Sequence, residues 1–136
     1  MRAIVLDNEA VQALSHPDHA KHRVVVAHLA GAVARRRRGA MVRTVVPTAV
    51  RVEAGWDRSA GSAAAINRFR VVDALLDTAT ANVGAQIVGR TGVSVADAHV
   101  GAAAQSVIAD DVVVLTSDPE DMVRVSAPKT IVAISI

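Results

Sequence analysis

Four acidic residues carry the strongest chemical signal in this sequence: Asp7, Glu53, Asp97 and Asp118. Asp7 and Asp118 follow apolar runs typical of buried strands, whereas Glu53 and Asp97 lie on the apolar stripes of predicted helices. Carboxylates are costly to bury close together unless a positive charge lies between them. Oxygen ligands of this kind favour Mg²⁺ or Mn²⁺. If the four converge, they form a divalent-metal site suited to phosphodiester chemistry.

Three of these acids also have a purely structural interpretation as helix caps. Asp7 directly precedes a predicted helix, and Asp118 followed by Pro119 reads as an N-cap with proline at the first helical position. Ser94 to Asp97 has the spacing of a capping box. Cap and ligand roles can coexist at a helix start, so these patterns leave both interpretations open.

Glu53 is the acid that capping explains least. It shares a helical stripe with Ala49, Val52 and Trp56, and this spacing predicts that the carboxylate lies on the core-facing side. The alternative is a slightly rotated helix with Glu53 at the solvent boundary. Asp97 raises the same question, because its predicted stripe is otherwise apolar and consists of Val100, Gly101 and Ala104.

The elements that must position these acids alternate between strands and helices along the chain. Such alternation predicts a parallel α/β sheet with helices on both faces and a ligand site beyond the carboxyl ends of the strands. The first and fourth strands are expected to be neighbours, which would place Asp7 beside Asp118. The predicted strands are 2–6, 42–46, 71–72, 112–115 and 130–134, and the predicted helices are 9–14, 18–37, 47–56, 59–69, 79–90, 95–108 and 119–123.

Length and composition favour a single domain over residues 1–136. Half of the chain is apolar, and nearly all of this is aliphatic, because there is one Phe, one Trp and no Tyr. This apolar surplus predicts a subunit interface. Cysteine is absent, and no segment has the length of a signal-peptide core or a membrane span, so a cytoplasmic location is expected.

Two other polar features have competing interpretations. The run Arg35–Arg38 suits a solvated helix C-terminus, where cations complement the helix dipole, and equally suits a contact with RNA phosphates or an acidic protein segment. His99 is two residues from Asp97 and therefore faces away from it, so a surface or interface position is expected. The early histidines do not share one helix face, which argues against zinc.

Four segments, taken in order, resemble the successive motifs of PIN-domain proteins, and most closely those of VapC-type toxins from bacterial toxin–antitoxin pairs. They are 4–7 (Ile-Val-Leu-Asp), 46–53 (beginning Val-Pro-Thr-Ala-Val and ending at Glu53), 95–104 (beginning Val-Ala-Asp-Ala) and 114–121 (Val-Leu-Thr-Ser-Asp-Pro-Glu-Asp). Each motif is loose, but the ordered set spans essentially the whole chain.

The resemblance implies a PIN-like three-layer α/β/α sandwich with a central parallel sheet in the order 3-2-1-4-5. It implies a metal-dependent endoribonuclease that hydrolyses RNA, acts as a homodimer and is blocked by a cognate antitoxin. It implies Mg²⁺ or Mn²⁺ held by Asp7, Glu53, Asp97 and Asp118, with Thr116 as the hydroxyl residue beside the site. Asp121 competes with Asp118 for the fourth position, and Asp118 is favoured here.

The competing functional class is a non-catalytic module, either a PIN-like scaffold or a receiver-like signalling domain. In a receiver, Asp7-Asn8-Glu9 would imitate the acidic pair after the first strand, and Asp73 would imitate the phosphoacceptor. The lysine expected after the last strand of a receiver is missing. The catalytic interpretation therefore predicts metal-dependent cleavage, and the receiver interpretation predicts phosphorylation of Asp73.

Overall fold

A computed structural model describes the whole chain, residues 1–136. Its five strands form one sheet in which all neighbours are parallel, in the order β3-β2-β1-β4-β5. This confirms both the predicted fold class and the strand order implied by the PIN-domain resemblance. The strands are β1 (Arg2–Leu6), β2 (Val42–Pro47), β3 (Val71–Ala74), β4 (Asp111–Thr116) and β5 (Val132–Ser135).

Helices connect all consecutive strands. They are α1 (Asn8–Ser15), α2 (His22–Arg37), α3 (Thr48–Ala54), the short 3-10 helix η1 (Gly61–Ala63), α4 (Ala64–Asn67), α5 (Thr78–Thr91), α6 (Val95–Ser106) and α7 (Pro119–Ser126). The predicted helix 59–69 is replaced by the two short elements η1 and α4. The helix predicted from residue 18 begins only at His22, because the chain first makes tight turns in which the His19 and His22 amides donate to the carbonyls three residues earlier.

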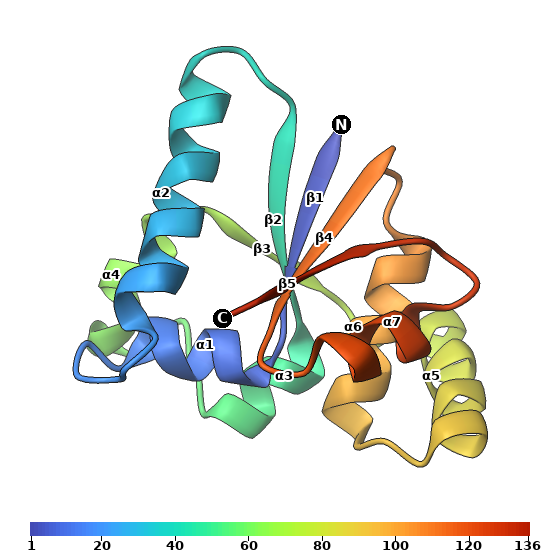
Figure 1. Cartoon of the computed structure of the whole chain (residues 1–136). Helices are drawn as coiled ribbons and strands as arrows, with labels where there is room; N and C mark the ends of the chain where they lie inside the picture. The colour runs from blue at the N-terminus through green and yellow to red at the C-terminus, as the bar shows by residue number, and fades with distance from the viewer.

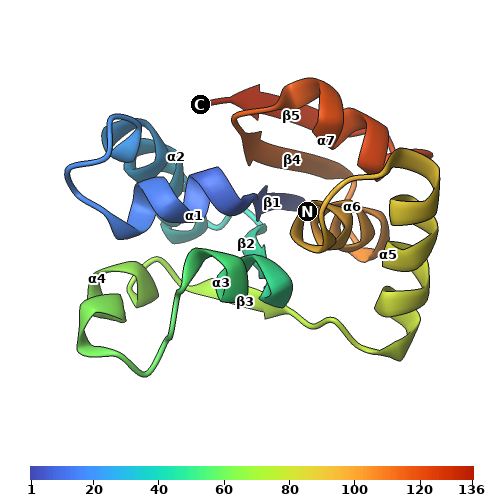
Figure 2. The ribbon, with the colours of Figure 1, turned by 90° about the horizontal axis from the view of Figure 1, so that it is seen from below.

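The sheet is covered on both faces, which gives three layers. α1, α2 and α4 lie on one side, and α5, α6 and α7 lie on the other (Figures 1 and 2). Seen from below, α1, α3, α6 and α7 surround the carboxyl ends of the central strands (Figure 2). Any side chain that leaves the end of β1 or β4 therefore points into a region enclosed by helix termini. No helix of the fold has the length and apolar character required to cross a membrane.

The core is aliphatic, as the composition predicts, and one cluster of 30 buried apolar residues fills it. The central strands β1 and β4 are apolar on both faces because helices cover both. On one side, α6 is buried almost all round, and its row of small residues permits close packing. Gly101 is the tightest point, since a Cβ there would overlap the backbone carbonyl of Val125 in α7. This contact fixes α6 against α7.

Candidate metal centre

Asp7 lies where β1 ends and α1 begins, and it is buried with 5% exposure. Its Oδ1 accepts the Ala10 backbone N–H at 2.8 Å, so the residue is the N-cap of α1. Burial raises the pKa of the Asp7 carboxyl, although hydrogen bonds from Ala10, the Thr116 hydroxyl and the Ser117 backbone act in the opposite direction. Asp7 thus caps α1 from a desolvated position at the sheet edge, so the capping interpretation is confirmed, and its role as a metal ligand stays a prediction.

Thr116 ends β4 and is completely buried. Its hydroxyl oxygen accepts the Asp118 backbone N–H at 2.9 Å, which fixes the turn into α7. The same hydroxyl is hydrogen-bonded to the Asp7 carboxylate and lowers its pKa. Thr116 therefore links the ends of the two neighbouring central strands beside the acids.

Asp97 lies in the first turn of α6, where the Ser94 hydroxyl oxygen accepts its backbone N–H at 3.1 Å. The predicted capping contact is present, and the carboxylate is half-buried. The pKa of Asp97 is raised first by burial and then by the negative charges of Asp7, Glu53 and Asp121. The fold thus brings four carboxylates from β1, α3, α6 and α7 into one electrostatic neighbourhood, which we call the carboxylate cluster.

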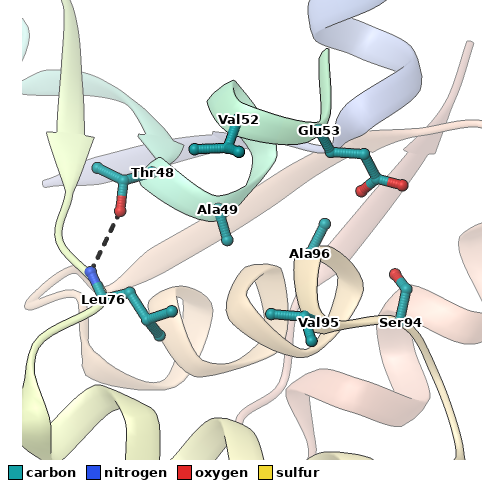
Figure 3. Close-up of a pocket in the computed structure, with 8 residues that line it drawn as sticks. All are labelled: Thr48, Ala49, Val52, Glu53, Leu76, Ser94, Val95 and Ala96. Atoms are coloured by element: carbon teal, nitrogen blue, oxygen red, sulfur yellow. Dashed lines mark hydrogen bonds between the residues drawn. The ribbon is translucent and has the colours of Figure 1, made fainter. Parts of the chain in front are cut away.

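Glu53 belongs to this cluster, but the predicted stripe of α3 was wrong. Val52 is 82% exposed, whereas Val50 is fully buried, so the helix is rotated and Glu53 is exposed at the solvent boundary. From there its side chain extends toward α6, above Ser94 and Ala96 (Figure 3). The hollow between the two helices is mainly apolar and is lined by Thr48, Ala49, Val52, Glu53, Leu76, Ser94, Val95 and Ala96.

Asp118 and Asp121 have different roles at the start of α7. Asp118 is exposed, and its Oδ1 accepts the Asp121 backbone N–H at 3.2 Å as an N-cap. Asp121 is the one whose charge raises the pKa of Asp97. It also forms an ion pair with Arg124 at 2.8 Å. Asp121 therefore contributes its charge to the cluster and Asp118 caps α7, and the choice of fourth metal ligand between them stays a prediction.

The chemistry of the cluster fits a hard divalent cation. Every donor is a carboxylate oxygen, and Asp7, Glu53 and Asp97 form no ion pair with any Lys, Arg or His, since the ion pairs of the chain involve other acids. As the side chains stand, no three of them converge tightly enough to hold an ion jointly. Mg²⁺ does not need such a cage, because it keeps several waters and binds through one or two carboxylates. Asp7 and Asp97 are the residues best placed for this.

One polar group beside the cluster has no partner. The Oδ1 atom of Asn8, the residue after Asp7, is buried and makes no hydrogen bond. Asn8 thus has an unused oxygen acceptor at the residue that follows Asp7. An unpaired buried acceptor is costly, and a bound ion or its water shell would satisfy it.

His99 is the functional residue whose position the sequence predicted incorrectly. It is 1% exposed, not on the surface, because α6 is buried almost all round. Its Nδ1 accepts the Ala49 backbone N–H at 3.2 Å, while Nε2 makes no hydrogen bond. Burial lowers the pKa of His99, opposed by the Leu75 carbonyl and the charge of Asp77. The neutral imidazole therefore fastens the start of α3 to α6, the two helices that carry Glu53 and Asp97.

The receiver-like interpretation was wrong. Doubly wound receiver domains have the strand order 2-1-3-4-5, with the third strand in the centre of the sheet, whereas here β3 is at the edge. Asp73 also has a structural role. Its carboxylate is bound by Arg51 at 2.7 Å and by Arg58 at 2.9 Å. Arg58 in turn lies 4.4 Å from the ring centroid of Trp56, so Asp73 anchors a packed cluster at the end of β3.

The chain is similar to solved structures from one bacterial species. No protein-family model and no curated protein sequence matches the chain. Among solved structures, FitAcB from Neisseria gonorrhoeae superimposes with a TM-score of 0.54 at 15% identity, covering 97% of this chain and 96% of its own. A structure of FitAB bound to the IR36 DNA fragment gives a TM-score of 0.57 at 16% identity, covering 97% of this chain and 94% of its own.

The chain has a PIN-like fold. The match covers almost the full length of both chains, so the likeness includes the sheet, both helical layers and the edge that carries the carboxylates. At this identity the likeness establishes the fold alone. The function of the PIN-like fold in this protein therefore depends on the residues of the site itself.

Proposed function

We propose that this PIN-like chain is a metal-dependent endoribonuclease, the toxin of a VapBC-type toxin–antitoxin pair. The observation that carries the proposal is the position of Asp97, whose pKa is raised by burial and by three surrounding carboxylates with no cation paired to it. An acid whose pKa is raised within a group of like charges is typical of a functional site. The structural likeness to FitAB, itself a VapBC-type complex with a PIN-domain toxin, supports the same class.

The proposed roles follow from the surroundings of each residue. Asp7 and Asp97 are the primary ligands of Mg²⁺ or Mn²⁺, with Glu53 and Asp121 completing the negative field. When bound, such an ion polarises a phosphate oxygen and lowers the pKa of its bound water. Thr116 is a positioning residue that keeps the ends of β1 and β4 together through its bonds to Asp7 and to the Asp118 amide. No side-chain nucleophile is required.

The decisive experiment measures cleavage of a fluorescently labelled structured RNA with and without Mg²⁺ or Mn²⁺. Asp97→Asn removes the charge but keeps the shape, and the helix start remains capped by Ser94. We expect this variant to lose at least about 10-fold in rate. The matched control is Asp77→Asn, a helix cap whose replacement by Asn preserves capping of α5. Equal cleavage by the Asp97→Asn variant and the unaltered chain would refute the proposal.

We propose further that the protein forms a homodimer and that a cognate antitoxin covers the cleft. Support comes from the apolar hollow beside Glu53, where Val52 is 82% and Val95 is 65% exposed. Exposed apolar surface next to a charged site is unusual for an isolated monomer. Sedimentation of the purified chain, alone and with the protein encoded beside it, tests both parts of this proposal.

A non-catalytic PIN-like scaffold is the competing function, and metal binding separates it from the nuclease. In a scaffold without catalytic activity, the carboxylates would be only structural, and Mg²⁺ titration calorimetry would detect no heat that depends on Asp7 and Asp97. In the nuclease, calorimetric binding and cleavage are lost together in the Asp97→Asn variant.

A further inference from the structure

A second charged site lies between the end of α2 and the start of β3. It is a hollow of about 330 Å³ lined by Val33 and four arginines, Arg36, Arg37, Arg68 and Arg70, and we call it the arginine hollow. At roughly 30 Å³ per water molecule, it has room for about eleven waters, or for one oxyanion with part of its hydration shell. The four arginines come from two segments that are about 30 residues apart in sequence, so only the fold brings them together.

None of the four guanidinium groups is paired with a carboxylate. All ion pairs of the chain involve other basic groups, such as Arg2, Arg51 and Arg58. Arg36 is instead held by backbone carbonyls, donating to Val42 at 3.3 Å and to Phe69 at 2.9 Å. These two bonds hold one guanidinium in place at the junction of α2, β2 and β3.

The backbone at Arg70 adds an independent sign of constraint. Its φ angle is +55°, and it is the one residue other than glycine with positive φ. This left-handed conformation costs roughly 1 kcal/mol or more for a side chain of this kind. Such positions concentrate at functional sites, where surrounding contacts compensate for the strain. Here the strained residue is one of the four arginines that line the hollow.

The concentration of like charge is unfavourable without an anion. The pKa of Arg36 is lowered by burial and then by the charge of Arg70. An oxyanion in the hollow would relieve that repulsion and would accept the unused N–H donors. Guanidinium groups bind phosphate through two parallel hydrogen bonds, a geometry that lysine cannot supply.

We propose that the arginine hollow binds a phosphate group of the RNA backbone, as a substrate contact separate from the carboxylate cluster. This inference rests on the proposed ribonuclease function. The arginines of the hollow come from the end of α2 and the residues before β3, which are at the amino ends of β2 and β3. The acids of the cluster follow β1 and β4 or begin the neighbouring helices, at the opposite edge of the sheet. Figure 1 shows these elements. Five strand residues at about 3.3 Å each separate the two edges by roughly 17 Å. Only an RNA that spans this distance can contact both.

RNA is favoured over an acidic peptide because of the lining. Val33 is the one apolar residue among the five, and peptide docking normally depends on apolar anchors in pockets. Phosphate contacts need only charge and donors. The chain also offers no aromatic platform for stacked bases, having one Trp and one Phe, both buried, so contacts to the RNA backbone must carry much of the affinity.

The test measures RNA binding by fluorescence anisotropy at 50 and 200 mM salt, in an Asp7→Asn background that preserves the bound RNA. The test variant is Arg37→Gln/Arg70→Gln. Neither side chain makes a hydrogen bond within the protein. The matched control is Arg23→Gln/Arg35→Gln, which removes the same charge from α2 outside the hollow. The logarithm of the RNA-binding constant falls linearly with the logarithm of the salt concentration, and loss of two phosphate contacts to single-stranded RNA makes that slope shallower by about 1.4. Between 50 and 200 mM salt, the drop in affinity of the test variant should therefore be about sevenfold smaller than that of the chain with all four arginines.

The inference is supported if the test variant weakens binding and flattens the salt slope while the control does not. It is overturned if both double variants behave alike, or if an acidic peptide occupies the hollow and RNA of any length does not. When Asp7 is left unaltered, the Arg37→Gln/Arg70→Gln substitutions should not affect cleavage of a short oligonucleotide, which cannot span both edges. Failure of the nuclease proposal appears separately, as absence of cleavage by the unaltered chain, and leaves the binding result interpretable.

Discussion

Replacing Asp7 by Asn should lower activity and raise stability at the same time. The carboxyl is buried and its pKa is raised mainly by burial, so its ionised form opposes folding at neutral pH. Asn keeps the oxygen that caps α1, because Asn and Asp are about equally good N-caps. The variant therefore removes the charge without removing the bond to the Ala10 amide. Without metal, we expect a higher melting temperature for Asp7→Asn than for the unaltered chain.

The pH dependence follows from the direction of the shift. Because the folded pKa of Asp7 is above its unfolded value near 4, the native state binds more protons between the two values. Stability of the unaltered chain is therefore lost as pH rises through that window. The advantage of Asp7→Asn should be absent well below pH 4, should grow as pH rises and should then level off. Thermal unfolding, monitored through the fluorescence of the single tryptophan, measures this difference in melting temperature at each pH.

Magnesium should make the unaltered chain more stable than the Asp7→Asn variant, the reverse of their order without metal. At ten times its dissociation constant, a ligand that binds only the native state adds about 1.4 kcal/mol. With an unfolding entropy of roughly 2.1 cal/mol/K per residue, a chain of 136 residues gains about 5 °C in melting temperature. The Asp7→Asn variant should gain much less. Asp7→Ala is the control, since loss of the cap costs about 1 kcal/mol, or about 3.5 °C relative to Asn.

Two results would refute this reasoning. One is a lower melting temperature for Asp7→Asn than for the unaltered chain in EDTA at neutral pH, which would mean that the ionised carboxylate stabilises the fold. The other is an equal shift of both proteins by Mg²⁺, which would place the ion elsewhere on the chain.

Three further outcomes are expected. Gly101→Ala should destabilise the chain by about 1–3 kcal/mol because α7 must move to make room for the methyl group. Gly31→Ala lies in open space within α2 and should stabilise the chain by up to about 1 kcal/mol. Urea unfolding of the two variants measures both effects. His99→Phe should cost about 1–3 kcal/mol at pH 8. The pKa of His99 in the folded chain is below its unfolded value of about 6.5, so the unaltered chain loses stability as the pH falls from the unfolded pKa toward the folded pKa. The difference in unfolding free energy between the unaltered chain and His99→Phe should therefore become smaller at low pH. Asp121→Asn should reduce Mg²⁺-dependent cleavage by about 10-fold or more, while Asp118→Asn, which keeps the cap, should leave cleavage nearly unchanged. The reverse ranking would identify Asp118 as the fourth acid, as predicted from the sequence.

Most of the fold could be predicted from the sequence because its signals are local and agree with one another. The run 2–6 is β1 without change, and each of the other predicted strands is present with its ends shifted by one or two residues. Apolar strands alternating with helices leave few topologies once right-handed crossovers are required. The positions of Asp7 at a strand end and of Asp97 at a helix start could be predicted for the same reason, since both features are visible in the sequence.

The errors arose where position depends on packing between distant segments. α3 has only seven residues, and both of its possible stripes are apolar. The sequence pattern used Trp56 to choose the buried side of this helix. The helix ends at Ala54, however, and Gly55 with φ +69° turns the chain, so Trp56 does not continue the helical spacing. Trp56 is thus buried independently of the α3 stripe. His99 was assigned to the surface or to an interface because a sequence does not show that neighbouring elements bury α6 almost all round.

The choice between Asp118 and Asp121 also depends on packing, and here the packing has a chemical consequence. Gly101 lets the backbone of α6 approach that of α7 at Val125, which no residue with a Cβ would permit without movement. That approach brings the first turn of α7, and with it Asp121, into the field of Asp97. The spacing of charge at the candidate metal centre is therefore set by a glycine within a buried helix. A substitution at Gly101 that leaves the protein folded should alter metal affinity without touching a single ligand.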